Sequence, residues 1–370
     1  MNQTKKVYFN EIHFLRAFAC LGVLLVHVTA VYYTQHGDVH NWLTFMLNQL
    51  GRFGTPTFAV ISGFLLFFQV RNKGFDAKRF IQSRTVKIIS PFIIWSIFYL
   101  LVTKYILKGT WPADPKVFLY QFTLGESFYH LYFMAIVIQF YFLFPFLQLI
   151  RSKKAWCVAL VVAAIINSYF TDISHSVLFD GVIARVIVDK VFFLHWIFFF
   201  VFGGFMAYHW EEVVRVSQKH KWLFAVLAAA VYAGAVWEYK LMGSVPSKRL
   251  TNFVNLPILS FATIGLYPYF QKARWLKERL YTVGTLSMGI YLVHPFILVI
   301  LQRIVPEHMW ATRGLPLMFI IVLVLCVSMV RLIQVLPNHQ YIIPVPSPKK
   351  KSPSDSQEKR YNQQQKPVSV

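Results

Sequence analysis

The chain has 370 residues, of which 56% are hydrophobic and only 14% are charged. Soluble globular proteins carry about a quarter of charged residues, so a soluble fold could not hide this much apolar surface, whereas a lipid bilayer can. A net charge of +22 would suit a nucleic-acid-binding protein, but here Lys and Arg lie in short segments between apolar runs. We therefore expect a membrane protein with no nucleic-acid partner.

Apolar runs that approach the length of a bilayer-spanning helix, about 20 residues, recur along the whole chain. The residues at 41–53, just before the second run, are also fairly apolar, and we interpret them as a re-entrant or interfacial piece. The sequence predicts an all-α, polytopic bundle of about ten transmembrane helices, at 12–33, 54–70, 88–107, 128–150, 155–171, 191–209, 222–238, 252–270, 281–302 and 315–336.

The distribution of Lys and Arg predicts the orientation of these helices. With the N-terminus inside, the segments placed in the cytoplasm carry far more Lys and Arg than those placed outside, as the positive-inside rule requires. We therefore expect a multi-pass protein of the plasma membrane with both termini in the cytoplasm. Residues 1–345 form the membrane domain, and 346–370 are expected to be a disordered, basic cytoplasmic tail.

The first predicted helix carries an ionisable pair. Glu11 begins it, Arg16 follows, and His27 comes eleven residues after Arg16. Eleven steps of 100° end about 20° from three full turns, so Arg16 and His27 share a face, roughly 16 Å apart. Charged groups inside a span are costly and are functional candidates by default. The structural alternative is that Arg16 reaches cytoplasmic phosphates and His27 caps a neighbouring helix.

Further polar residues fall inside other spans. With the predicted orientation, His130, His195 and His294 lie in the middle or outer half of the membrane, as His27 does. Several histidines at one depth suggest a polar cavity, in which a neutral imidazole could take a proton from a hydroxyl. Each of them could equally be a hydrogen-bonded packing residue.

The second and third spans contain further candidate functional residues, and each also has a purely structural explanation. Ser62 and Gly63 are either functional or a site of close helix packing. Arg84 and Lys87, at the inner mouth of the third span, either follow the positive-inside rule or bind a coenzyme with several phosphates. No nucleotide-binding P-loop and no His-Glu-x-x-His zinc motif occurs in the sequence, and we expect neither a metal nor a bound cofactor.

Five motifs occur in an order that resembles the membrane-bound acyltransferase 3 family, over about residues 8–336. They are Glu11-x4-Arg16-Ala with His27, Phe58-x3-Ser62-Gly-Phe64, Arg84-x2-Lys87-x3-Pro91-x3-Trp95, His130-Leu-Tyr-Phe and Ser287-x-Gly-x-Tyr-Leu-x-His294-Pro. The resemblance implies about ten helices and the transfer of a short acyl group from cytoplasmic acyl-coenzyme A, first of all acetyl-coenzyme A. It also implies a carbohydrate or lipid-linked sugar as acceptor.

The resemblance implies roles for single residues as well. Arg16 and His27 correspond to the family's essential pair. Many members carry two Glu residues in the fourth helix, where this chain has Val137 and Ile138, and in this it is similar to the subgroup that acts in exopolysaccharide modification.

The resulting hypothesis places the donor phosphates near Arg16, Arg84 and Lys87, with His27 as the base. Glu11, Ser62, His130 and His294 are second-choice acceptor or orienting residues. The rival hypotheses are an exporter of a polysaccharide or lipid-linked sugar, and a structural partner of envelope enzymes.

Overall fold

The computed structural model describes residues 10–150, 152–172, 186–243 and 245–347, and within these ranges every regular element is a helix. Nine helical stretches of the described chain are long and apolar enough to cross a bilayer. The expectation of an all-α polytopic bundle is therefore confirmed. The remaining expected span is α7 (Tyr132–Leu147), which is apolar but has only 16 residues.

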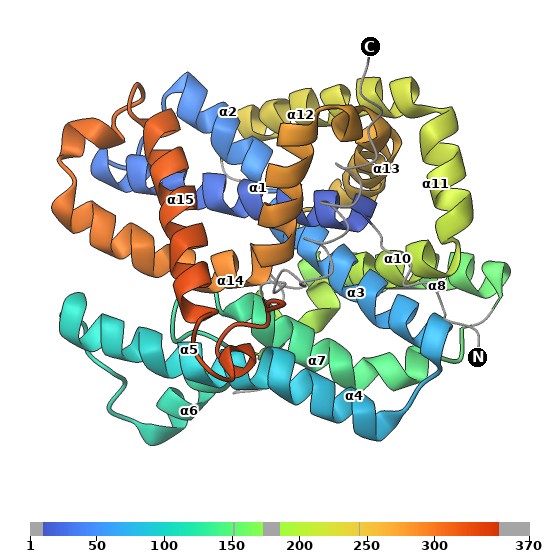
Figure 1. Cartoon of the computed structure of the whole chain (residues 1–370), viewed down its shortest axis with the longest axis horizontal. Helices are drawn as coiled ribbons and strands as arrows, with labels where there is room; N and C mark the ends of the chain where they lie inside the picture. Colours follow the sequence, from blue (N-terminus) through green and yellow to red (C-terminus); the bar gives the residue numbers. More distant parts are fainter. Residues whose placement is uncertain (1–9, 151, 173–185, 244, 348–370) are drawn as a thin grey trace, which may run out of the picture.

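The other helices follow the expected order along the chain (Figure 1). They are α1 (Asn10–Gln35), α2 (Trp42–Gly51), α3 (Gly54–Lys73), α4 (Ala77–Arg84), α5 (Ser90–Leu101), α6 (Pro115–Thr123), α8 (Lys153–Asp172), α10 (Ile197–Tyr208), α11 (Trp210–Lys219), α12 (Lys221–Met242), α13 (Asn252–Lys272), α14 (Arg274–Ile304) and α15 (Leu315–Ile333). Short π-helical turns occupy Thr85–Ile89 and Val102–Ile106, and 3-10 turns occupy Phe193–His195, Glu307–Trp310 and His339–Tyr341.

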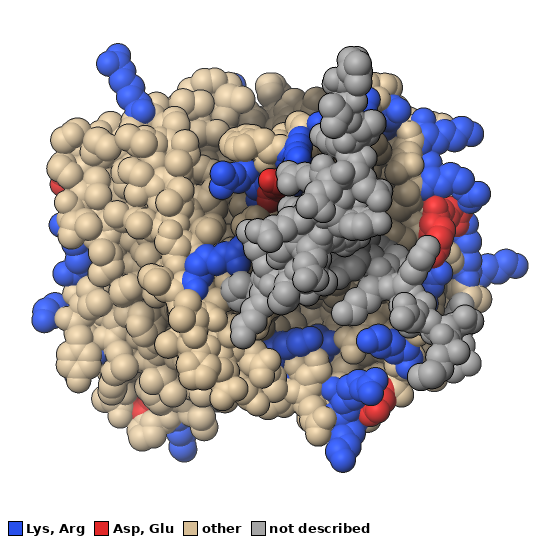
Figure 2. Space-filling model, viewed as in Figure 1, with Lys and Arg blue, Asp and Glu red and all other residues tan. Residues whose placement is uncertain are grey.

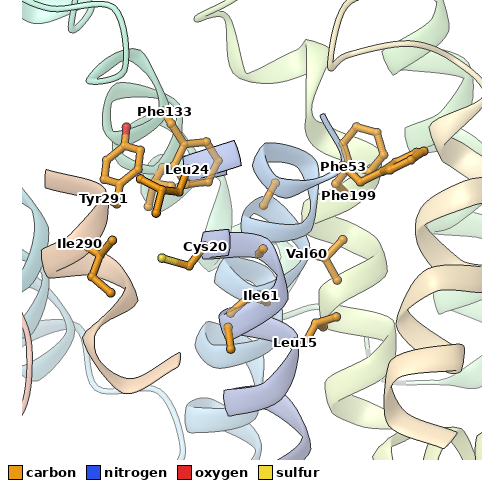
Figure 3. Close-up of a cluster of buried hydrophobic side chains, with 14 of the residues drawn as sticks. Leu15, Cys20, Leu24, Phe53, Val60, Ile61, Phe133, Phe199, Ile290 and Tyr291 are labelled. Carbon is orange, nitrogen blue, oxygen red and sulfur yellow. The ribbon is translucent and has the colours of Figure 1, made fainter. Parts of the chain in front are cut away.

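The core is built around α1. Figure 3 shows α1 between α14 on one side and α3 with α10 on the other. Two glycines bring α3 and α10 into backbone contact, because a β-carbon at Gly63 would collide with the carbonyl oxygen of Phe200, and one at Gly203 with that of Val60. Small residues are what membrane helices use for such close approach, so the packing interpretation holds for Gly63.

The second and third spans begin earlier than the hydropathy of the sequence suggests. α2 runs into α3 after only two residues, and Asn41 caps α2 by accepting a hydrogen bond of 2.9 Å from the backbone N–H of Thr44. Similarly, α4 continues through the π-helical turn into α5, so that Ala77–Ile106 forms one helical stretch. The cations Arg84 and Lys87 are therefore carried by a helix.

The outer helices leave their apolar faces uncovered. Trp222, Val226 and Trp237 of α12 are each more than 60% exposed, which suits contact with lipid chains. Charged side chains gather at the right edge of Figure 2, where α11 lies in Figure 1. There Arg71 pairs with Glu211 at 2.9 Å. This contrast between apolar and charged surface is what a bilayer and its polar boundary select.

The segment after α15 turns back and packs against the helical bundle. Trp95 of α5 donates a hydrogen bond of 2.9 Å to the carbonyl of Ile342. Gln334 donates one of 2.6 Å to the carbonyl of Pro346. This segment, His339–Ser347, is thereby held against α5 and the end of α15. The predicted tail begins at 346, and its part from 348 onward lies outside the described residues.

Candidate functional site

A cavity of about 760 Å³ lies between α1, α3, α7, α14 and the π-helical turn after α4, and residues of the C-terminal segment form part of its lining. This volume is in the range of small-molecule and cofactor sites. Three cations line it, namely Arg16, Arg84 and Lys87, and no Asp or Glu is among its lining residues. We call it the inner cavity. It is suited to a ligand with several negative charges.

Arg16 is held in the inner cavity by α14. Its Nε donates a hydrogen bond of 3.2 Å to the hydroxyl of Ser287, which is fully buried. His13 lies one turn before Arg16 on α1 and lines the same cavity, as the i, i+3 spacing on a helix requires. Glu11, near the start of α1, does not line this cavity.

Arg84 and Lys87 approach the inner cavity from the opposite side. Arg84 donates a hydrogen bond of 2.8 Å to the side chain of Gln69 on α3, and its guanidinium lies 5.7 Å from the ring centre of Tyr141. Lys87 sits in the π-helical turn. Such turns are frequent at functional sites. Here the turn presents a lysine one helical turn from an arginine.

Two further cavity residues bear on the chemistry that the sequence suggested. Ser62 lines the inner cavity, and its hydroxyl donates to the carbonyl of Phe58 at 2.8 Å. Val137 also lines the cavity. At a position for which the family resemblance of the sequence implies a glutamate in many members, this chain therefore presents an apolar side chain to the cavity.

A second, smaller space lies nearer the other end of α1. Its volume is about 90 Å³, and its lining includes His27, His130, Arg52 and Tyr291 but no carboxylate. We call it the outer pocket, after the predicted orientation of the chain. Arg16 and His27 thus share α1 but line two different spaces.

Three histidines, from α1, from α14 and from the turn before α7, meet beside the outer pocket. The ring centre of His27 lies 5.0 Å from that of His294 on α14. The ring of His294 is in turn 5.5 Å from that of His130. His195, in contrast, lies apart, and its Nε2 is 3.0 Å from the carbonyl oxygen of Ile187. Within the described residues no group of His, Cys, Asp or Glu is arranged to hold a metal ion.

The histidine cluster is oriented by the backbone of α14 and by tyrosines. Nδ1 of His294 is 2.8 Å from the carbonyl of Tyr291, while its buried Nε2 has no partner among the described residues. A proton on Nδ1 leaves Nε2 as an acceptor. The hydroxyl of Tyr291 donates to the carbonyl of His130, and that of Tyr99 to the carbonyl of Leu292 at 2.7 Å.

A packed layer separates the inner cavity from the outer pocket. Figure 3 shows part of it, with Leu24 beside Phe133 and Tyr291, and Cys20 turned toward α14. The space within this layer cannot hold a water molecule. Phe133 lines both the inner cavity and the outer pocket, and the ring of Phe58 is 6.2 Å from it. These two aromatic rings therefore stand between Arg16 and His27.

Sequence reasoning missed several residues of these spaces. His13 could have been found from its spacing to Arg16. Arg52 carries no signal of its own in the sequence beyond that of a charge outside the predicted spans. The residues of the C-terminal segment that line the inner cavity gave no signal, because a short polar stretch after the last span carries no periodicity that predicts where it packs.

Known proteins resemble nearly the whole chain. The model of a family described as an acyltransferase domain matches residues 9–331. A protein of Staphylococcus aureus strain MRSA252 is 25% identical over 336 residues, which cover 86% of this chain and 92% of the relative. A Staphylococcus epidermidis protein is 23% identical over 302 residues, 78% of this chain and 81% of its own length. Both are named probable poly-beta-1,6-N-acetyl-D-glucosamine export proteins. No solved structure matches significantly.

Proposed function

The chain belongs to the acyltransferase 3 family, and from this premise we propose that it moves an acetyl or other short acyl group from cytoplasmic acyl-coenzyme A to a sugar hydroxyl outside the plasma membrane. As a member of this family it is a multi-pass membrane acyltransferase. Our proposal adds to this family activity the identity of the donor, the class of the acceptor and the direction of transfer. The observation that carries the proposal is the pair of adjoining spaces, one lined by cations and the other by histidines.

The inner cavity supports acyl-coenzyme A as the donor. Coenzyme A carries several phosphate oxygens, and Arg and Lys are the side chains that bind such groups through charge-assisted hydrogen bonds. Arg16, Arg84 and Lys87 converge on the cavity without a carboxylate among its lining residues to neutralise them. Cations without a counter-charge in a partly buried site lose hydration free energy. An anionic ligand would compensate for this loss.

The outer pocket supports His27 as the base. Its ring has no hydrogen-bond partner among the described residues, and it lies against His294 and, at 4.9 Å between ring centres, Tyr129. A neutral imidazole in this setting can accept a proton from a hydroxyl that enters the pocket. His294 and His130 then orient His27 or contact the acceptor.

The reaction follows from this placement. The oxygen of the sugar hydroxyl attacks the thioester carbonyl, and the hydroxyl proton passes to His27. The new C–O bond of the ester forms as the C–S bond breaks. The coenzyme A thiolate leaves, and the proton on His27 is finally released to it or to water. The acyl group must cross the layer of Phe58 and Phe133, which favours short acyl groups.

The test is release of free coenzyme A by the full-length protein in lipid nanodiscs, with acetyl-coenzyme A and an envelope extract as acceptor. We expect His27→Ala to lower the rate by about 100-fold to 10,000-fold, the usual range for loss of a general base. His308→Ala is the matched control, because this histidine is exposed and lines neither space. An unchanged rate in His27→Ala would contradict the assignment of the base.

Export of a polysaccharide is a second candidate function, and the names of the staphylococcal relatives favour it. An exporter would move its polymer across the membrane without releasing coenzyme A. The same assay therefore separates the two functions. No coenzyme release from the wild-type protein, together with polymer movement into sealed vesicles, would favour export.

A further inference from the structure

Arg52 lies at the junction of α2 and α3 and lines the outer pocket together with His27 and His130. A half-buried arginine beside a candidate base needs a reason, because burial of a cation without a counter-charge is unfavourable. It cannot belong to the donor site, since it does not line the inner cavity. Its position therefore concerns whatever enters the outer pocket.

The side chain of Arg52 is held in place by a chain of hydrogen bonds. Its Nε donates to Oδ1 of Asn48 at 2.9 Å. The amide of Asn48 donates to the hydroxyl of Thr29 at 3.0 Å, and this hydroxyl donates to the carbonyl of Leu25 at 2.8 Å. Both Asn48 and Thr29 are buried. Arg52 is thus fixed to α1, the helix that carries His27.

The charge of Arg52 has no counter-ion in the described structure. The four ion pairs there involve other cations, and the lining of the outer pocket contains no Asp or Glu. The nearby carboxylate of Glu238 is taken by Arg249, at 3.1 Å. Burial lowers the pKa of Arg249, and the positive charge of Arg52 lowers it further, against the effect of Glu238.

The loop that carries Arg249 adds to the positive field. Ser247 of this loop lines the outer pocket. Lys248 follows it, and burial lowers the pKa of this lysine, while Asp189 opposes the change. The terminal nitrogens of Arg52 have no hydrogen-bond partner among the described residues, so they remain available to a ligand.

We propose that Arg52 is the anion-binding residue of the acceptor site. Its guanidinium binds a carboxylate or phosphate carried by the acceptor, next to the hydroxyl that His27 activates. The planar fork of arginine matches either group. The preferred acceptor is therefore an acidic sugar or a sugar phosphate. This inference rests on the proposed function for the identity of the pocket, but its test contains no acyl donor.

The test is equilibrium binding of three small sugars to the full-length protein in nanodiscs. Glucuronic acid carries a carboxylate, glucose 1-phosphate carries a phosphate, and glucose carries neither. We expect at least one anionic sugar to bind about tenfold more tightly than glucose, the effect of one charge-assisted contact. A preference for glucuronic acid indicates an acidic sugar, and one for glucose 1-phosphate indicates a phosphate-linked acceptor.

The variants decide whether Arg52 is responsible. Arg52→Gln should abolish the preference, and Arg52→Lys, which keeps the charge without the fork, should retain part of it. Arg313→Gln, an exposed arginine outside both spaces, should leave it intact. Equal binding of all three sugars, no binding of either anionic sugar, or a preference that survives in Arg52→Gln would overturn the inference. Coenzyme A release, measured separately, reports on the proposed function itself.

Discussion

The inner cavity and the outer pocket differ in how they are built. The inner cavity has about 760 Å³ and is lined by long cationic side chains, two of them on or beside a π-helical turn. The outer pocket has about 90 Å³, and beside it histidine and tyrosine rings are packed and tied to backbone carbonyls. One space suits a large, flexible, polyanionic ligand, whereas the other suits the exact placement of one reacting group.

This difference separates the two contributions to catalysis. Residues that only bind a ligand change its affinity, while residues that place the reacting group change the rate at saturation. We expect substitutions in the inner cavity to act mainly on KM for acyl-coenzyme A and those beside the outer pocket mainly on kcat. Three further predictions test this division.

The largest effect is expected for His294→Ala. Loss of this ring removes the contact that orients His27, and a displacement of about 1 Å can cost roughly 100-fold in rate. Initial rates at saturating acetyl-coenzyme A should fall by that factor, with little change in KM for the donor. His195→Ala, which removes another buried histidine apart from the cluster, is the control. If His294→Ala changed only KM, the expectation that residues beside the outer pocket act mainly on kcat would be contradicted.

A smaller effect is expected for Arg84→Gln. It removes a cation of the inner cavity and should raise KM for acetyl-coenzyme A by about tenfold, because one charge-assisted hydrogen bond is lost. The rate at saturation should change little, and the dependence of KM on salt should weaken. The exposed Lys78, which does not line the cavity, provides the control Lys78→Gln. A fall in kcat with unchanged KM would contradict the prediction.

The smallest effect is expected at the layer between the two spaces. Phe133→Leu removes part of an aromatic ring that faces both, which opens room for a longer acyl chain. The ratio of turnover with butyryl-coenzyme A to that with acetyl-coenzyme A should rise a few-fold. Phe140→Leu replaces a buried ring on the same helix that lines neither space, and it should leave the ratio unchanged. An equal rise in both variants would point to general loosening of α7.

The sequence predicts the helices better than their ends. Apolar helices of the described chain lie in all ten expected stretches, and nine of these stretches are long and apolar enough to cross a bilayer, because a bilayer demands long apolar runs. Hydropathy placed the starts of the second and third spans too late, because it does not register that α2 and α4 continue helically into their neighbours. The 16 residues of α7 show the opposite limit, because apolar sequence alone does not determine how far a helix extends.

The candidate site was predicted in part. The positions of Arg16 and His27 on one helix follow from spacing, but spacing on one helix says nothing about contacts between helices. That His27, His130 and His294 meet became visible only from the packing of α1 against α14 and the residues before α7. The roles of these residues stay predictions. The sequence did not single out Arg52, because one arginine before a span cannot be told from the charges that only set the orientation of a membrane helix.

The backbone contact between α3 and α10 restricts how the protein can move. At Gly63 and Gly203 no β-carbon separates the two backbones, and such close packing leaves little room for one helix to slide along the other. We therefore expect α3 and α10 to move together as one unit. Phe58 is carried by α3, so under the proposed function we expect the passage for the acyl group to open on the side of α7, which carries Phe133.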